Sequence, residues 1–381
     1  MTKNGHKGYA LEELLRAYFL RAGMYAVRGV PLLSEGDDLT DIDIWLYERP
    51  TGSSRRRQIV DAKSKLKPKA IERVFWTKGL LELLKVDGAY IATTDSRSVI
   101  KEISSRIGVA VLDGADLKRM AESEKVLFAD RLTEEDLERL IKIVDRGRRN
   151  KDLQSRYQDL KAGLIDGFGA GTVNRAIEHF IGFVRILGSS HPNSRAAEVA
   201  LRLAYIAASI VSVTLDFALA KVSFKSTEER HKTISNVIRF GDDDESSGTE
   251  KVRVAAALIE RYAPNGRATA QSMLNAIQED FRSVPAEIVA DHVLTQLKGD
   301  SLFRVARSLE FEGFNVGMVG FDQLNLEEKS FLGVILDFAR LERSTFADAW
   351  NVKLGAEYIK KNVRGEPSPE SGGSSGRLFE S

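Results

Sequence analysis

The sequence of 381 residues contains no cysteine. Disulfide bonds, thiolate zinc sites and cysteine nucleophiles are therefore excluded, and this composition fits a reducing compartment. The first residues, MTKNGHKGYALEE, lack the apolar stretch of a secretory signal. We therefore expect a cytoplasmic protein.

Long hydrophobic runs and an excess of either charge are also missing. The longest apolar run lies between Arg202 and Asp216, which is too short to cross a bilayer and predicts a buried helix. The chain has 56 Lys and Arg against 55 Asp and Glu, a net charge of +1. The total charge is thus uninformative about nucleic acid, and only local clustering can point to it.

The N-terminal third predicts an alternation of helices and strands. Residues 41–47 place Ile42, Ile44 and Leu46 on one face and Asp41, Asp43 and Trp45 on the other, as a strand does. A turn rich in Gly, Ser and Arg separates them from a returning strand, which predicts a β-hairpin. We expect helices over 8–22, 69–85, 96–107 and from 115, and strands over 25–27, 41–47, 58–63, 89–93 and 109–112. This order predicts an α/β domain over residues 1–126.

The pattern changes near residue 126. Thr133 is followed by Glu134, Glu135 and Asp136, which is typical of a capped helix start. From residue 130 to 363 the periodicity is helical, and residues 364–381 are rich in Pro, Gly and Ser. We therefore expect an α/β domain, then a mainly α-helical domain over 130–363, then a disordered tail over 364–381.

A D-x-K triplet on the returning strand carries the chemistry. Asp61 and Lys63 point to one face of that strand, because their positions differ by two. Asp43 lies on the partner strand of the hairpin, so a second carboxylate can reach that face. Two carboxylates with a few waters suit Mg²⁺. Such a metal activates water and neutralises charge on a phosphate, while the lysine steadies the water or the phosphate.

Residues 8–117 resemble the PD-(D/E)xK nuclease superfamily, and among its members the Mrr-like restriction endonuclease domains. The motifs that carry the resemblance occur in family order: Gly8–Glu12, Gly23, Thr40–Ile44, Val60–Lys63, Ala89–Thr94 and Leu112–Leu117. The resemblance implies a restriction-endonuclease-like fold and a metal-dependent endonuclease, with Mg²⁺, or alternatively Mn²⁺, as cofactor. It also implies catalytic roles for Glu12, Asp43, Asp61 and Lys63, with the three acids as metal ligands.

Simpler interpretations stay open for single residues. Glu12 is also what the surface of an amphipathic helix would carry, and Asp43 is also what a solvated strand face would carry. Phe75 and Trp76 are interpreted as core residues rather than as platforms for bases.

A basic cluster coincides with the triplet. Residues 49–78 hold ten Lys and Arg against two acids, a local balance of +8. We expect the cluster to surround the site and to contact a phosphate backbone. Its members expected to bind nucleic acid are Arg55, Arg56, Arg57, Lys65, Lys67 and Lys69. Ordinary lysines and arginines on a solvated hairpin tip are the alternative.

Two functions follow for the whole chain. The first is a Mg²⁺-dependent endonuclease that hydrolyses phosphodiester bonds, with DNA as the expected partner. Its helical domain would select targets, sense a signal, or drive association with itself or another protein, as in restriction and antiphage systems. The second is a catalytically silent nucleic-acid-binding or protein-interaction module that retains a nuclease fold. The intact set of Asp43, Asp61 and Lys63 favours the enzyme.

Overall fold

The computed structural model describes residues 3–34, 37–63, 69–123, 127–149, 151–242, 245–297 and 299–350. These residues form two compact units. Unit 1 runs to Asp166 and includes Phe314–Met318, and unit 2 covers Gly167–Gly313 and 319–350. The tail expected over 364–381 lies outside the described residues.

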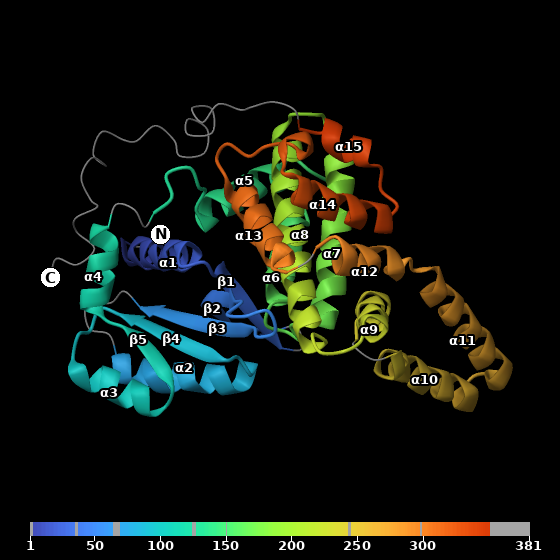
Figure 1. Cartoon of the computed structure of the whole chain (residues 1–381), viewed down its shortest axis with the longest axis horizontal. Coiled ribbons are helices and arrows are strands. Elements are labelled where there is room, and N and C mark those ends of the chain that lie inside the picture. The colour runs from blue at the N-terminus through green and yellow to red at the C-terminus, as the bar shows by residue number, and fades with distance from the viewer. Residues whose placement is uncertain are drawn as a thin grey trace. The chain divides into compact units, whose positions relative to one another are not determined.

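A mixed five-stranded sheet forms the centre of unit 1 (Figure 1). Its strands are β1 (Tyr25–Ser34), β2 (Asp37–Glu48), β3 (Arg56–Lys63), β4 (Gly88–Thr93) and β5 (Val109–Leu112), and they lie side by side in that order. The pairs β1–β2 and β2–β3 are antiparallel, whereas β3–β4 and β4–β5 are parallel. The β2–β3 hairpin expected from the alternation is thereby confirmed.

The first strand is much longer than the three residues that we expected. Its sequence contains Gly29, at a φ of +60°, and Pro31, and both weaken a strand considered alone. Pairing with β2 from Tyr25 to Ser34 nevertheless keeps the segment extended, with an irregularity between Leu32 and Leu33. The loop expected after residue 27 is therefore a strand, because tertiary pairing outweighs local preference.

Helices cover both faces of the sheet, with α1 on one face and α2 and α3 on the other (Figure 1). The helices of unit 1 are α1 (Lys3–Arg21), α2 (Ala70–Leu84), α3 (Ser98–Arg106), α4 (Gly114–Glu122), α5 (Glu134–Arg146) and α6 (Leu153–Ala162). Leu11 and Leu15 of α1 pack with Ile44, Val60 and Leu117 in one buried cluster. This packing anchors α1, and with it Glu12, against the central strands.

The end of unit 1 lies beyond the boundary that we expected. Thr133 caps α5 through the backbone N–H of Asp136, and the Asp136 carboxylate accepts from the backbone N–H of Thr133, which confirms the capped helix start. The following helix, α6, packs on β1. Because of that contact, α5 and α6 group with the sheet rather than with the later helices, and the helical unit begins at Gly167.

Unit 2 is helical throughout its described residues, as expected for this part of the chain. Its elements are α7 (Ala170–Gly188), α8 (Arg195–Lys221), α9 (Thr227–Phe240), α10 (Glu245–Tyr262), α11 (Gly266–Ser283), α12 (Ala286–Thr295), α13 (Ser301–Phe314), the 3₁₀ turn η1 (Phe321–Gln323), α14 (Leu326–Phe338) and α15 (Arg343–Asp348). The last residue of α13 belongs to unit 1. Helices α10 and α11 form a hairpin that extends away from the other helices of this unit (Figure 1).

The long helix α8 is the core of unit 2. Its side chains from Leu203 to Leu215 are buried, which confirms the prediction of a buried helix. By length and composition α8 could cross a membrane, and it is the one such helix among the described residues. Its most apolar window is 83% buried inside the structure, as in the core helix of a folded domain.

Two glycines of unit 1 provide a matched test of the fold. A Cβ on Gly114 would meet the carbonyl oxygen of Thr94 at 2.6 Å, so Gly114→Ala should destabilise the protein by about 1–3 kcal/mol. A Cβ on Gly79, inside α2, meets nothing within 4 Å. Gly79→Ala should therefore stabilise by about 0.5–1 kcal/mol. Denaturant unfolding of both variants measures the difference, and equal effects would contradict the close approach of α4 to residue 94.

Candidate active site

The β2–β3 hairpin places Asp43 beside Asp61. Ile44 pairs with Val60, so Asp43 lies opposite Asp61 at the next position of the same antiparallel pair. The Asp43 carboxylate also accepts a hydrogen bond of 2.6 Å from the backbone N–H of Ala62. Two carboxylates from neighbouring strands therefore meet at one end of the hairpin.

The charge state of Asp43 reports which groups surround it. Burial raises the pKa of this carboxyl from its usual value to about 7, the positive charge of Lys63 and the Ala62 N–H oppose the rise, and the negative charges of Asp61 and Glu12 add to it. Glu12, Asp61 and Lys63 thus all lie close enough to act electrostatically on Asp43. A carboxyl poised near neutral pH can release or take a proton readily, as functional sites often require.

Asp61 is held by an arginine to which we had assigned no catalytic role. Its side chain is buried and accepts from Arg73 of α2, through Nε at 2.8 Å and through a second, shorter contact with Nη2. The Arg73 guanidinium also lies 5.7 Å from the ring of Trp76. In the sequence this arginine is only one member of a basic cluster, because no spacing rule links a helix residue to a strand ten or more positions earlier.

Phe75 and Trp76 are exposed, with 58% and 47% of their surface accessible. The prediction that they belong to the core is therefore wrong. The core positions of α2 are taken by Ala70, Val74, Thr77 and Leu80 instead. The Trp76 ring is thus available on the side of α2 that also carries Arg73.

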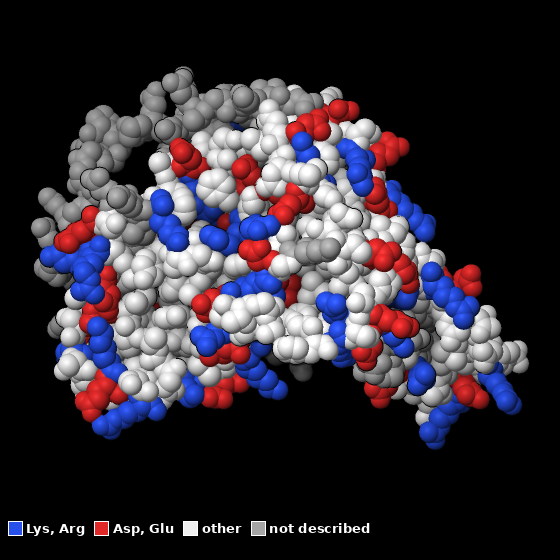
Figure 2. Space-filling view, in the orientation of Figure 1, with Lys and Arg blue, Asp and Glu red and all other residues white. Residues whose placement is uncertain are grey.

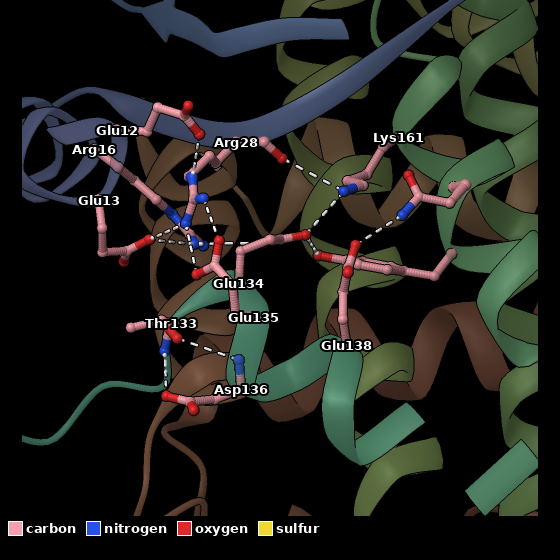
Figure 3. Close-up of polar contacts among 12 residues, drawn as sticks. Glu12, Glu13, Arg16, Arg28, Thr133, Glu134, Glu135, Asp136, Glu138 and Lys161 are labelled. Carbon is pink, nitrogen blue, oxygen red and sulfur yellow. Dashed lines mark hydrogen bonds and ion pairs between the residues drawn. The ribbon is translucent and has the colours of Figure 1, made fainter. Parts of the chain in front are cut away.

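Glu12 lies against a buried arginine of β1 (Figure 3). The Arg28 side chain donates from Nε to Glu12 at 2.9 Å and from Nη1 to Glu13 at 3.2 Å. It also donates twice to Glu135 of α5, from Nη1 at 2.9 Å and from Nη2 over a shorter contact. Burial raises the pKa of Glu12, and the charge of Arg28 only partly offsets this rise.

A second set of buried charges continues from Arg28 into α6 (Figure 3). Glu134 accepts from Lys161 and from the Tyr157 hydroxyl, each at 2.8 Å, and lies 3.5 Å from Arg16. Burial alone would raise the pKa of Glu134, but the charges of Lys161 and Arg16 bring it below the usual value. Lys161 also donates to the backbone carbonyl of Arg28 at 3.4 Å. In the sequence, this network is signalled by Arg28 alone, a single arginine within an apolar strand. A buried charge must be paired, so such an arginine predicts acidic partners.

A protein site for a divalent cation such as Mg²⁺ needs oxygen donors that converge on one point. Among the described residues, no three acidic, histidine or cysteine side chains converge in a way that could hold a metal ion. Glu12 is paired with Arg28, so its role as a third ligand stays a prediction. Asp61 is likewise paired with Arg73, through both carboxylate oxygens. Two neighbouring carboxylates and water commonly hold Mg²⁺, so the role of Asp43 and Asp61 as its ligands also stays a prediction.

Only part of the basic cluster expected around these carboxylates is described there: Arg73 pairs with Asp61, and the charge of Lys63 acts on Asp43. Arg57 lies at the start of β3 and Arg55 just before it, whereas Asp61 lies near the end of the strand, about 13–20 Å away at the rise of a strand. Arg55 donates to the carbonyls of Thr51, Gly52 and Ser54, and Arg57 to that of Lys85. Arg55 therefore stabilises the hairpin turn, and Arg57 links the start of β3 to the residue that follows α2.

The other members of the cluster have varied positions. Arg56 is exposed at the start of β3, and Lys69, just before α2, is exposed and paired with Glu72 at 2.9 Å. Lys65 and Lys67 lie outside the described residues. On the face seen in Figure 2, acidic and basic side chains are interspersed over the described surface.

Comparison with known protein families, with curated proteins and with solved structures finds no match for this chain. The family resemblance therefore rests on the short motifs quoted above.

Substitution of Asp43 tests its buried position. Its pKa of about 7 in the folded protein exceeds that of an unfolded aspartate, about 3.9, so the folded state binds more protons between these values. Stability should consequently fall as the pH rises from about 4 to 7. Asp43→Asn retains an acceptor for the Ala62 N–H but cannot ionise. We expect its stabilising effect to be roughly 2 kcal/mol larger at pH 8 than at pH 5.

Urea unfolding of the wild type and of the variant at both pH values measures this effect. Asp41→Asn, at an exposed position of the same strand, is the control. A gain from Asp43→Asn that is the same at pH 5 and pH 8 would show that Asp43 is not held near neutrality.

Proposed function

We propose that unit 1 is a restriction-endonuclease-like domain of the PD-(D/E)xK type that hydrolyses phosphodiester bonds, with DNA as its expected substrate. The observation that carries the proposal is the position of Asp43 beside Asp61 on neighbouring antiparallel strands, within electrostatic range of Lys63. A mixed sheet with α1 on one face and α2 on the other is in keeping with this fold.

Asp43 and Asp61 would hold Mg²⁺ or Mn²⁺. The metal would activate water and neutralise charge on the phosphate. Lys63, two positions after Asp61, would place its ammonium group against the attacked phosphate, where preorganised positive charge has its largest effect.

Arg73 offers a further contact to the substrate. Its guanidinium has five N–H donors and uses two of them on Asp61, and its side chain is 28% exposed. Arginine recognises phosphate through just such spare, parallel donors. Exposed Trp76, beside Arg73, presents a ring face on which a base could stack.

The alternative function is a catalytically silent module that binds nucleic acid or protein. It is favoured by one specific observation, namely that two of the three expected acids are already ion-paired, Glu12 with Arg28 and Asp61 with Arg73. In either case unit 2 would supply targeting, sensing or association with another protein chain. A restriction or antiphage role is the biological setting that the proposal implies.

The chemistry predicts a simple pattern of losses. Asp61→Asn and Lys63→Ala should each reduce cleavage by about 100-fold or more, because each removes a group that acts on the reacting phosphate. Lys63→Ala should still bind metal. Activity should require Mg²⁺ or Mn²⁺, whereas Ca²⁺ should support binding with little turnover. Nicking assays on plasmid, linear, single-stranded and RNA substrates, with calorimetric titration of metal, measure both effects.

Asp41→Asn serves as the matched control and should keep full activity, since this aspartate is exposed. Cleavage that survives both site substitutions, or that proceeds in EDTA, would leave the binding module as the better interpretation.

The positions of the basic residues predict where the backbone of the nucleic acid lies. Lys69, which precedes α2, is close in the chain to Arg73, whereas Arg56 lies at the far end of β3 from Asp61. Lys69→Ala should reduce the slope of log affinity against log salt by about one, because one fewer counterion is released. Arg56→Ala should leave the slope unchanged. The reverse result would place the backbone at the hairpin turn.

A further inference from the structure

Unit 2 contains a cavity of about 690 Å³. It is lined by residues of α9, α10 and α11 and by Glu287 in the first turn of α12. A volume of this size is typical of sites for small organic molecules. The cavity lies wholly within unit 2, whereas the proposed nuclease site lies in unit 1.

The charged side chains that line the cavity are mostly positive. Arg239, Arg253 and Arg282 contribute three positive charges and Glu287 one negative charge. Glu287 is paired with Arg239, while Arg253 and Arg282 are exposed and form no ion pair with any described residue. The surplus of two positive charges matches the charge of a phosphate monoester near neutral pH.

Apolar and aromatic side chains form the rest of the lining. Phe240 and Phe281 lie with their ring centroids 4.9 Å apart and their planes at 74°, and both rings are half-buried. Leu274 and Ile277 of α11 are half-buried beside them. A ligand that fills this cavity must therefore carry a flat or apolar body as well as its negative charge.

Gln278 adds a hydrogen-bonding group on the same helix. Its side-chain amide offers a donor and an acceptor in one plane, which can pair with the edge of a nucleobase. Gln278 is exposed, so its amide is available to a ligand. A heteroaromatic ring satisfies the aromatic lining and the amide together.

We propose that this cavity binds a nucleoside phosphate. The phosphate lies against Arg253 and Arg282, whose planar guanidinium groups suit phosphate oxygens. The base lies against Phe240 and Phe281 and pairs with Gln278. Unit 2 is thus a nucleotide-binding unit in its own right.

Calorimetric titration of the full-length protein with AMP, GMP, CMP and UMP, in buffer with EDTA, tests the proposal. At least one of the four should bind with a Kd below about 1 mM, and at least tenfold more tightly than its nucleoside or inorganic phosphate. Arg253→Gln and Arg282→Gln should each weaken binding about tenfold. Phe281→Leu should weaken the nucleotide without changing the affinity for phosphate. Arg267→Gln, an exposed arginine of α11 outside the cavity, should have no effect.

Several outcomes would overturn the proposal. These are an absence of binding by all four nucleotides at about 10 mM, equal binding of nucleoside and nucleotide, and equal binding of phosphate alone. Nucleotide binding that persists unchanged in Arg253→Gln and Arg282→Gln would locate the ligand elsewhere in the chain. Tighter binding of decyl phosphate than of every nucleotide would show that the apolar body is an alkyl chain, and would likewise reject a nucleoside.

Discussion

A single buried cation, the guanidinium of Arg28, fixes how unit 1 is assembled. The residue is 2% exposed in a strand otherwise occupied by apolar side chains. An isolated charge cannot remain there, and its five N–H donors bring carboxylates from two helices to β1. Glu12 and Glu13 come from α1 and Glu135 comes from α5. Removing one partner of such a buried pair commonly costs about 3–5 kcal/mol, so the three elements depend on one another.

The same constraint governs the electrostatics of the candidate site. Burial raises the pKa of Asp43, and the negative charges of Asp61 and Glu12 add to the rise. Arg28 neutralises Glu12 and Arg73 neutralises Asp61, which leaves Asp43 with Lys63 as its nearest compensation. The effect of burial is therefore least offset at Asp43, and the pKa of its carboxyl is about 7. The arginines that stabilise the fold thus also decide which carboxyl is free to change its charge.

Short-range patterns explain which parts of this arrangement were predictable. The alternation over 41–47 identified the β2–β3 hairpin, and that hairpin alone brings Asp43 next to Asp61. The capping pattern at Thr133 predicted the start of α5. The Arg28–Glu135 pair spans 107 positions, and no local pattern encodes it. The exposure of Trp76 and the packing of α6 on β1 likewise follow from tertiary contacts that periodicity does not contain.

In unit 2, different helices form the buried core and the proposed ligand site. Its interior is built around α8, whose side chains are buried almost from end to end. The hairpin of α10 and α11 packs mainly on itself and on α9, and it exposes apolar side chains such as Leu258 and Tyr262. Elements with few buried contacts open at a lower free energy than the core. A ligand held between α9 and this hairpin would therefore order the least stable part of the unit without disturbing the most stable one.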